Sequence, residues 1–356
     1  MPPAASTGTA TSPLLSGMRF GVGDRYWWET TSGQYATTPQ LLAQNGFPAN
    51  NQLLGIWLPA GWQPSWFTGI QSDMDQGDVP VFIHYTLGDL AQYGNSAWSY
   101  VQSQQQAWLA DVSRLAQALA PLKGTVLVVL QPEFNVPSIE DQPGFGALLA
   151  QGAQILHAAQ TPQLRILVGA CPGDFGVYAG TTVDTVNWDA FKPALTPALG
   201  SLDFLAFQEM RGQIFDGAQQ TPDQQGLSLL PARTLAFAQY LQATYGKPLL
   251  LAYMTVATFN SPSDPLGWDA LAAQATAGVL AEARQLHAAG LFGIMAMSLF
   301  DDLSHNNDGK DAWGEASRYF GLIASNGTMG QAALGAPPYT IKQVGKAWIQ
   351  GTAAWK

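Results

Sequence analysis

The sequence predicts an α/β protein folded as a single (β/α)8 TIM barrel. Eight short apolar runs alternate along the chain with segments of helical pattern, and each run is nearly continuous in hydrophobic residues. Parallel strands that are buried on both faces have this composition. The length of 356 residues lies in the range of one such barrel. We therefore expect a catalytic barrel over residues 18–356, preceded by a disordered leader over residues 1–17.

The eight apolar runs are the predicted strands, and they are listed here in chain order: 18–28, 51–59, 79–88, 124–135, 164–175, 202–211, 247–258 and 291–302. Between them, apolar residues at three- and four-residue spacing predict helices over 96–120, 145–159, 231–245 and 269–289. An open doubly wound sheet is disfavoured. Gly21-Val22-Gly23 after the first run lacks the third glycine and the helix start of a dinucleotide site.

The leader is inferred from residues 1–17, MPPAASTGTATSPLLSG, which are small, polar and proline-containing. The segment has no charged start and no apolar core, so it is not an intact signal peptide. It fits what remains of a secreted protein after removal of its signal. We expect a secreted or periplasmic location, and a cytoplasmic one stays open.

Composition excludes several classes of function. Hydrophobic residues make up 47% of the chain and charged residues 11%, which excludes a disordered protein. No apolar run is long enough for a membrane span, so no membrane partner is expected. The net charge of -10 argues against nucleic acid as a partner. One cysteine, Cys171, and four dispersed histidines do not suggest a metal site, and no cofactor is expected. The oligomeric state stays open.

The active site of a barrel lies at the carboxyl ends of its strands, so polar residues there are candidates. Those expected to bind substrate or carry out chemistry are Arg25, His84, Glu133, Asn135, Asp174, Gln208, Glu209, Tyr253, Asp301, Asp302 and His305, with Asp24 and Asp89 nearby. Indole rings stack on the apolar faces of sugars, and four tryptophans fall near these ends: Trp27, Trp28, Trp57 and Trp62.

Two carboxylates stand out because they end long apolar runs. Partial burial there raises the pKa of a carboxyl group, which suits a general acid. Glu133 is the predicted acid. Glu209 is equally consistent with a second catalytic carboxylate and with a salt bridge to Arg211 or Arg25. Glycoside hydrolysis uses two carboxylates on either side of the scissile bond, and Asp302 is the alternative to Glu209.

The segment LVVLQPEFNVP, residues 127–137, resembles the end of strand 4 in clan A glycoside hydrolases. It is most similar to the mannanase-like family 26, in which a glutamate is followed two residues later by an asparagine. The resemblance implies that Glu133 is the acid/base and that Asn135 orients the substrate. It also implies that His84 and Arg25 bind the sugar. The seventh run, LLLAYMTVAT, departs from the clan because it lacks the nucleophilic glutamate.

The sequence therefore predicts a glycoside hydrolase that cleaves a poly- or oligosaccharide by carboxylate acid/base chemistry. Two alternatives stay open. The missing glutamate allows a carbohydrate-binding barrel without catalysis. A metal-assisted hydrolase or lyase would instead use Asp24, Asp174, Glu209 and Asp302.

Overall fold

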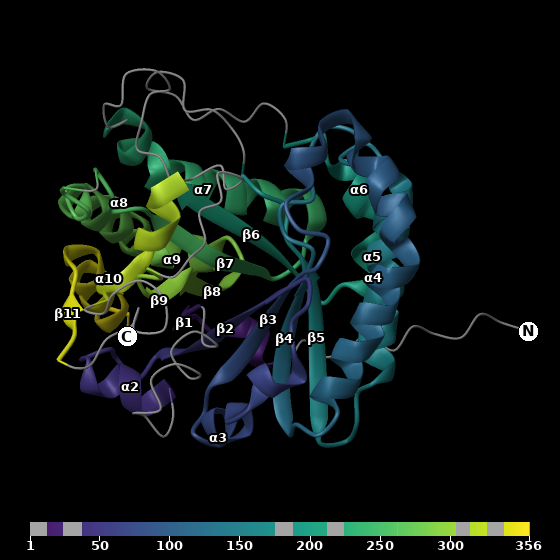
Figure 1. The fold of residues 1–356 in the computed structure, drawn as a ribbon, viewed down its shortest axis with the longest axis horizontal. Helices are drawn as coiled ribbons and strands as arrows, with labels where there is room; N and C mark the ends of the chain where they lie inside the picture. Colours follow the sequence, from purple (N-terminus) through teal and green to yellow (C-terminus); the bar gives the residue numbers. More distant parts are fainter. Residues whose placement is uncertain are drawn as a thin grey trace, which may run out of the picture.

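The computed structural model describes residues 13–23, 38–174, 188–211, 224–261, 263–303, 314–325 and 338–355. Eight parallel strands close into one barrel in the order β1 to β8, which confirms the predicted (β/α)8 fold (Figure 1). The strands are β1 Arg19–Val22, β2 Asn51–Pro59, β3 Val79–Tyr85, β4 Gly124–Leu130, β5 Leu164–Ala170, β6 Phe204–Arg211, β7 Leu249–Val256 and β8 Leu291–Ala296.

Helices follow the strands and form the outer layer. They are α2 Thr38–Gln44, α3 Ile70–Asp75, α4 Ala97–Leu119, α5 Pro143–Ala158, α6 Lys192–Leu195, α7 Gln224–Tyr245, α8 Asp269–Ala281, α9 Ala283–Ala288 and α10 Gln343–Ala353. Figure 1 shows α4, α5 and α6 on one flank and α7 to α10 on the other. The segment 269–289, predicted as one helix, is broken at Glu282 into α8 and α9.

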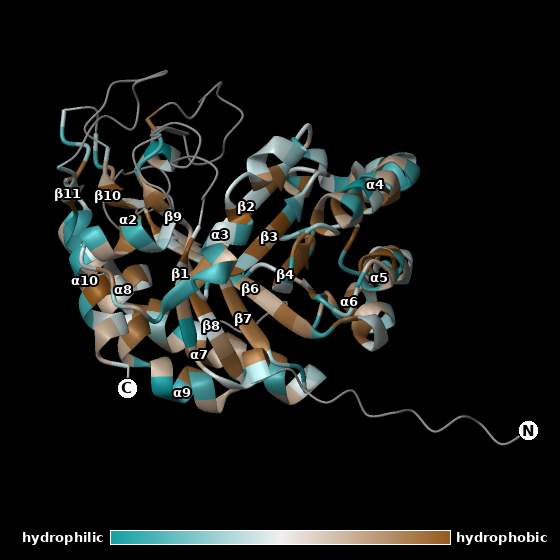
Figure 2. Ribbon diagram, turned by 90° about the horizontal axis from the view of Figure 1, so that it is seen from below, coloured by the Kyte–Doolittle hydropathy of each residue, from teal (hydrophilic) through white to brown (hydrophobic). Residues whose placement is uncertain are grey.

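Two apolar layers hold the barrel together. Alternate strand residues such as Val81, Leu127 and Leu250 fill its interior, whereas Phe82, Val128 and Leu251 pack outward against the helices. Figure 2 shows the strands in brown at the centre and teal on the outer helices α4, α9 and α10. Because both faces of each strand are buried, apolar composition alone does not reveal which side chains face inward.

The amino-terminal floor of the barrel is closed by a short 3-10 helix, η1 Pro13–Ser16. Leu14 and Leu15 are buried in the inner apolar layer, and Arg19 donates a hydrogen bond to the Leu14 carbonyl at 2.9 Å. The predicted disordered leader is therefore wrong for its last residues. Two adjacent leucines supply enough apolar surface to order them, although their polar neighbours suggested otherwise.

A small sheet extends the barrel beyond β8. It contains β9 Ser298–Phe300, β10 Gly321–Ala324 and β11 Thr340–Ile341. Residues 291–302, predicted as one strand, thus divide between β8 and β9. Within the described residues, the helices are all too short or too polar to cross a lipid bilayer.

Candidate active site

Five residues of the predicted site and its alternatives lie outside the described residues: Asp24, Arg25, Trp27, Trp28 and His305. The structure separates the others by the direction in which their strands present them. Trp57, Glu133, Gln208 and Tyr253 gather inside the barrel at the carboxyl ends of the strands, which we call the mouth. His84, Trp62, Asp174 and Glu209 lie in the layer between barrel and helices.

Glu133 is held by an unusual backbone turn that follows β4. Gln131 and Glu133 both adopt the left-handed conformation, with φ of 37° and 60°. Such residues cost about 1–3 kcal/mol each and persist only where the surroundings hold them. The Gln131 N–H donates to the His84 carbonyl at 2.9 Å, and the Glu133 N–H donates to the Cys171 carbonyl at 2.8 Å. The turn is thus tied to both neighbouring strands, and it ends the strand five residues earlier than the sequence predicted.

Glu133 as a whole residue is half-buried, and the surroundings of its carboxyl group favour the protonated form. Burial raises its pKa to about 7, a hydrogen bond from Tyr253 opposes this rise, and the negative charge of Asp89 adds to it. Asp89 is exposed at the start of the helix η3 Leu90–Ser96, where its side chain accepts the Ala91 N–H at 2.8 Å. A carboxyl group with a pKa near neutrality can donate a proton at physiological pH.

Aromatic rings line the wall beside Glu133. Tyr253 Oη lies 2.8 Å from Glu133 Oε1 and donates a hydrogen bond to it. The Trp57 ring meets Tyr253 at 4.9 Å and Tyr85 at 5.7 Å between centroids, in both cases edge-on. Tyr253, predicted to bind substrate, is only 1% exposed, so it contacts Glu133 rather than offering its ring to a ligand.

Two further polar groups lie in this interior. Gln208 pairs in register with Tyr253 across β6 and β7 and is 4% exposed. Cys171 follows β5, and its thiol is fully buried in the inner apolar layer. Burial and the nearby Glu133 charge raise the pKa of the Cys171 thiol, so it stays neutral. It therefore packs as a small apolar side chain.

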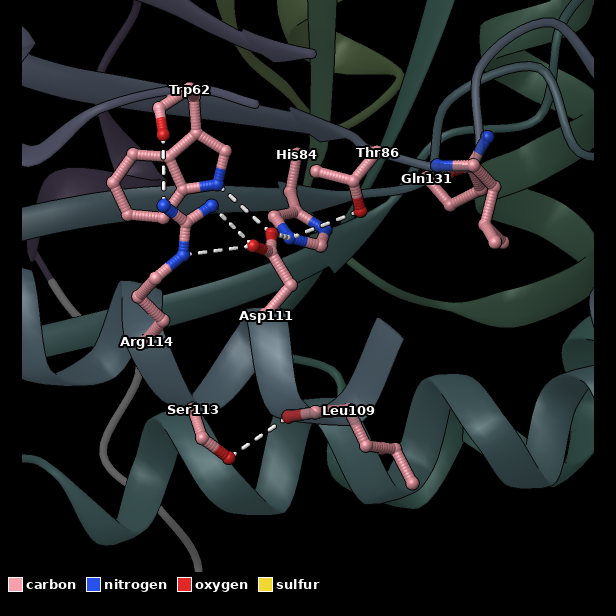
Figure 3. A network of polar contacts seen from close by, with 9 residues as sticks. Trp62, His84, Thr86, Leu109, Asp111, Ser113, Arg114 and Gln131 are labelled. Atoms are coloured by element: carbon pink, nitrogen blue, oxygen red, sulfur yellow. Dashed lines mark hydrogen bonds and ion pairs between the residues drawn. The ribbon is translucent and has the colours of Figure 1, made fainter. Parts of the chain in front are cut away.

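His84 and Trp62 belong to a polar network outside the barrel wall (Figure 3). Asp111 of α4 is its centre, accepting from Trp62 Nε1 at 2.9 Å and lying 2.7 Å from His84 Nε2. Arg114 also donates to Asp111 and lies 3.9 Å above the Trp62 ring. Burial alone would raise the Asp111 pKa, but donations from His84, Trp62 and Arg114 outweigh it and lower the pKa to about 2.

This network corrects two predictions. Trp62 and His84 are fully buried, so in this structure neither is presented to a sugar at the mouth. His84 points to the helices because it alternates with Ile83 and Tyr85, which face the interior. A cavity of about 180 Å³ adjoins the network and is lined by Thr86, Tyr100 and Asp111, among others.

Asp174 and Glu209 are also turned away from the mouth. Asp174 is 1% exposed and accepts hydrogen bonds from Arg233 of α7 at 2.5 Å and from Trp188 Nε1 at 3.0 Å. Glu209 is fully buried, and strand alternation places it on the same face as Phe207, whose ring packs 5.5 Å from Phe237 of α7. The interior residue that follows it is Met210.

The remaining candidates have structural partners or lie at the rim. The Asn135 amide donates to the Gly173 carbonyl at 2.8 Å and accepts the Gly173 N–H at 2.6 Å, which joins the loops after β4 and β5. Asp301 forms a buried 2.7 Å ion pair with Lys342 and supports the small sheet. Burial raises the Asp301 pKa to about 6, although Lys342 opposes the rise. Asp302 is half-buried after β9.

Sequence reasoning found several polar residues near the strand ends but missed the side chains that hydrogen-bond or pair with them. Asp111 and Arg233 lie in the middle of helices, where nothing in the sequence marks them as partners of His84 and Asp174. Asp89 was placed at the mouth without a role, and its effect on Glu133 emerges only from the folded structure. In the parts of the chain that the structure describes, no three His, Cys, Asp or Glu side chains gather as a metal site would require.

No family model matches the sequence, and no curated protein matches it. Solved structures do match. A broad-specificity endoglucanase of subfamily GH5-4 from Clostridium longisporum is 11% identical, with a TM-score of 0.55, over 97% of this chain and 98% of that one. A modular endo-β-1,4-mannanase of glycoside hydrolase family 26 from Cellulomonas fimi is 16% identical, with a TM-score of 0.52, over 93% and 73%.

Xylanase B from Clostridium stercorarium F9 is 11% identical, with a TM-score of 0.51, over 94% of this chain and 96% of that one. At such identities the likeness concerns the fold. The chain therefore shares its closed eight-stranded barrel fold with these endoglucanase, mannanase and xylanase structures.

Proposed function

We propose that this protein is a glycoside hydrolase in which Glu133 is the general acid. The observation that carries the proposal is the place of this residue: it is half-buried at the mouth, lies beside an aromatic wall, and is held by a strained turn. Backbone strain of this kind clusters at functional sites. The pKa of about 7 supports the role, because the group is then partly protonated at neutral pH.

The second carboxylate is assigned to the rim of the mouth rather than to β6 or β7. The strand β7 contains no acidic residue, and Glu209 of β6 faces the helices. Asp302 remains from the sequence prediction, and Asp89 joins it because its charge reaches Glu133. A retaining enzyme needs its carboxylates about 5 Å apart and an inverting one roughly 6.5–9.5 Å apart, so the anomeric configuration of the first product distinguishes the two geometries.

We further propose that the substrate is a neutral poly- or oligosaccharide and that Trp57 contributes to its binding. The net charge of -10 would repel a polyanion. Secretion, which would bring the protein to such polymers, remains a prediction from the leader segment.

A carbohydrate-binding barrel without catalysis is the second candidate, and the absence of an acidic residue from β7 favours it. The test is release of reducing ends from β-1,4-linked glucan, mannan and xylan by wild type and Glu133→Gln, with binding measured in parallel. Release that collapses at least 100-fold in Glu133→Gln supports the hydrolase. Binding by both proteins without release supports the binding barrel, and release that survives the substitution removes Glu133 from the mechanism.

Asp89→Asn and Asp302→Asn then identify the second carboxylate. Loss of turnover in one of them, with recovery by added azide as an external nucleophile, assigns a nucleophile at that position. Loss of turnover that azide does not restore, together with an inverted anomeric configuration in the wild-type product, assigns a general base at that position.

A further inference from the structure

Strand β7 contains an irregularity that decides what lies beside Glu133. Phe207 of β6 pairs with Leu251, but the next residue, Gln208, pairs with Tyr253, so Ala252 is an extra residue on β7. The pairing with β8 slips over the same stretch. A β-bulge of this kind re-aims the side chains that follow it and is frequent next to active sites.

The bulge turns Tyr253 into the barrel. Ala252 and Tyr253 both belong to the inner apolar layer, although neighbours along a regular strand face opposite sides. Met254, which a regular alternation from Leu250 would point inward, packs in the outer layer instead. One extra residue thus places a phenol, rather than a thioether, beneath the mouth.

Tyr253 is held firmly once it points inward. Its side chain is 1% exposed, its ring packs 4.9 Å from that of Trp57, and its hydroxyl lies 2.8 Å from Glu133 Oε1. A buried phenol with a hydrogen-bond acceptor at this distance is constrained in both rotation and position. Since so little of it is exposed, it can influence a substrate only through Glu133.

We propose that Tyr253 is a positioning residue, whose hydroxyl donates to Oε1 of Glu133 and thereby leaves the acidic proton on Oε2, facing the substrate. The inference rests on the proposed role of Glu133 as the acid and adds which of its two oxygens performs the transfer. A carboxylic acid donates from one oxygen, and the carbonyl-like oxygen is the better acceptor. The phenol therefore selects the orientation of the acid before substrate arrives.

The groups that face Glu133 are consistent with this role. From β7 comes Tyr253, from the end of β5 comes Cys171, and from the start of η3 comes Asp89. Burial and the Glu133 charge raise the pKa of Tyr253 well above its usual value, so the phenol keeps its proton. Among the described residues, Tyr253 is the hydrogen-bond donor to the Glu133 carboxyl group.

The test is a direct titration of Glu133 by NMR in protein labelled with ¹³C at the glutamate carboxyl carbon, with Glu133→Gln identifying the signal. In Tyr253→Phe, the lost donor had favoured the ionised form, so we expect the Glu133 pKa to rise by about 1. Tyr85→Phe is the matched control: it removes a phenol from the same aromatic wall and leaves the Glu133 titration in place. A Glu133 pKa that stays or falls in Tyr253→Phe overturns the proposal.

Incorporation of 3-fluorotyrosine at position 253 gives the opposite sign, because a more acidic phenol is a stronger donor and lowers the Glu133 pKa. This second arm applies even if Tyr253→Phe fails to fold, and an unchanged pKa there also counts against the role. Where turnover is measurable, the alkaline limb of kcat in Tyr253→Phe moves up with the pKa while KM is retained. If the Glu133 pKa shifts in Tyr253→Phe but the wild type shows no turnover, the positioning role of Tyr253 is upheld and the hydrolase is rejected. If the wild type turns over substrate but the Glu133 pKa does not shift in Tyr253→Phe, the hydrolase is upheld and the positioning role is rejected.

Discussion

Replacing Glu133 with glutamine should stabilise the protein, and by an amount that depends on pH. The Glu133 pKa rises from 4.5 to about 7 in the fold. Between these values the native protein holds a proton that the unfolded chain has released, so the free energy of unfolding falls as pH rises. Below the unfolded pKa the contribution is fully present, and it is lost as pH passes the folded pKa.

The magnitude follows from that difference. Each pH unit between folded and unfolded pKa corresponds to about 1.4 kcal/mol, so wild type should lose about 3 kcal/mol relative to Glu133→Gln between about pH 4 and about pH 8. Glu133 is a half-buried residue, so screening by solvent makes this value an upper bound.

Urea unfolding of both proteins across this pH range measures the effect. At about pH 4 both carry a neutral side chain at position 133, so this end of the series is an internal control. A difference between the two proteins that stays constant with pH would refute the reasoning, since it would mean that burial does not alter the ionisation of Glu133.

Three further outcomes are expected. Asp89→Asn removes a negative charge that raises the Glu133 pKa, so titration of Glu133 should show a lower value, and an unchanged one would contradict the assigned coupling. Arg233→Met removes the buried cation that pairs with Asp174 and should lower the free energy of unfolding in urea by about 3–5 kcal/mol. Adding Asp174→Asn should restore part of that stability, and no recovery would count against the ion pair as the cause. The Asp111 pKa is lowered to about 2, so its ionised carboxylate stabilises the fold above the usual pKa, and this stability is lost as pH falls towards 2. On acidification the free energy of unfolding should therefore drop by about 2 kcal/mol more in wild type than in Asp111→Asn, and parallel acid unfolding curves would disprove this expectation.

The barrel could be predicted because each of its strands is a nearly continuous run of apolar residues. The segment 51–59 was predicted with the bounds that β2 has, since apolar residues fill it from end to end. The predicted strand 124–135 is too long, because β4 ends at Leu130 and the left-handed turn at Gln131 and Glu133 follows, although Pro132 and Phe134 continue the apolar pattern. Backbone hydrogen bonds from the turn to His84 of β3 and to Cys171 after β5 determine where the strand ends. Such contacts cannot be read from the sequence.

The site was harder to predict for a related reason. Glu133 lies at the mouth shortly after the apolar run of β4 ends, and its catalytic role stays a prediction. His84 and Glu209 also lie at strand ends, but their face depends on strand alternation, and strands buried on both sides give no sign of it. For Tyr253 the face depends on one extra residue in β7, which only the pairing with β6 reveals.

The short helix η1 has a practical consequence for handling the protein. It lies at the amino-terminal end of the barrel and covers its floor with Leu14 and Leu15, whereas Glu133 lies at the opposite end of the strands. An affinity tag or a solid support attached upstream of Pro13 would leave the mouth open to a large polymer. Trimming the chain back to Arg19 to obtain a minimal barrel would instead uncover the interior from below, so expression vectors should keep these residues.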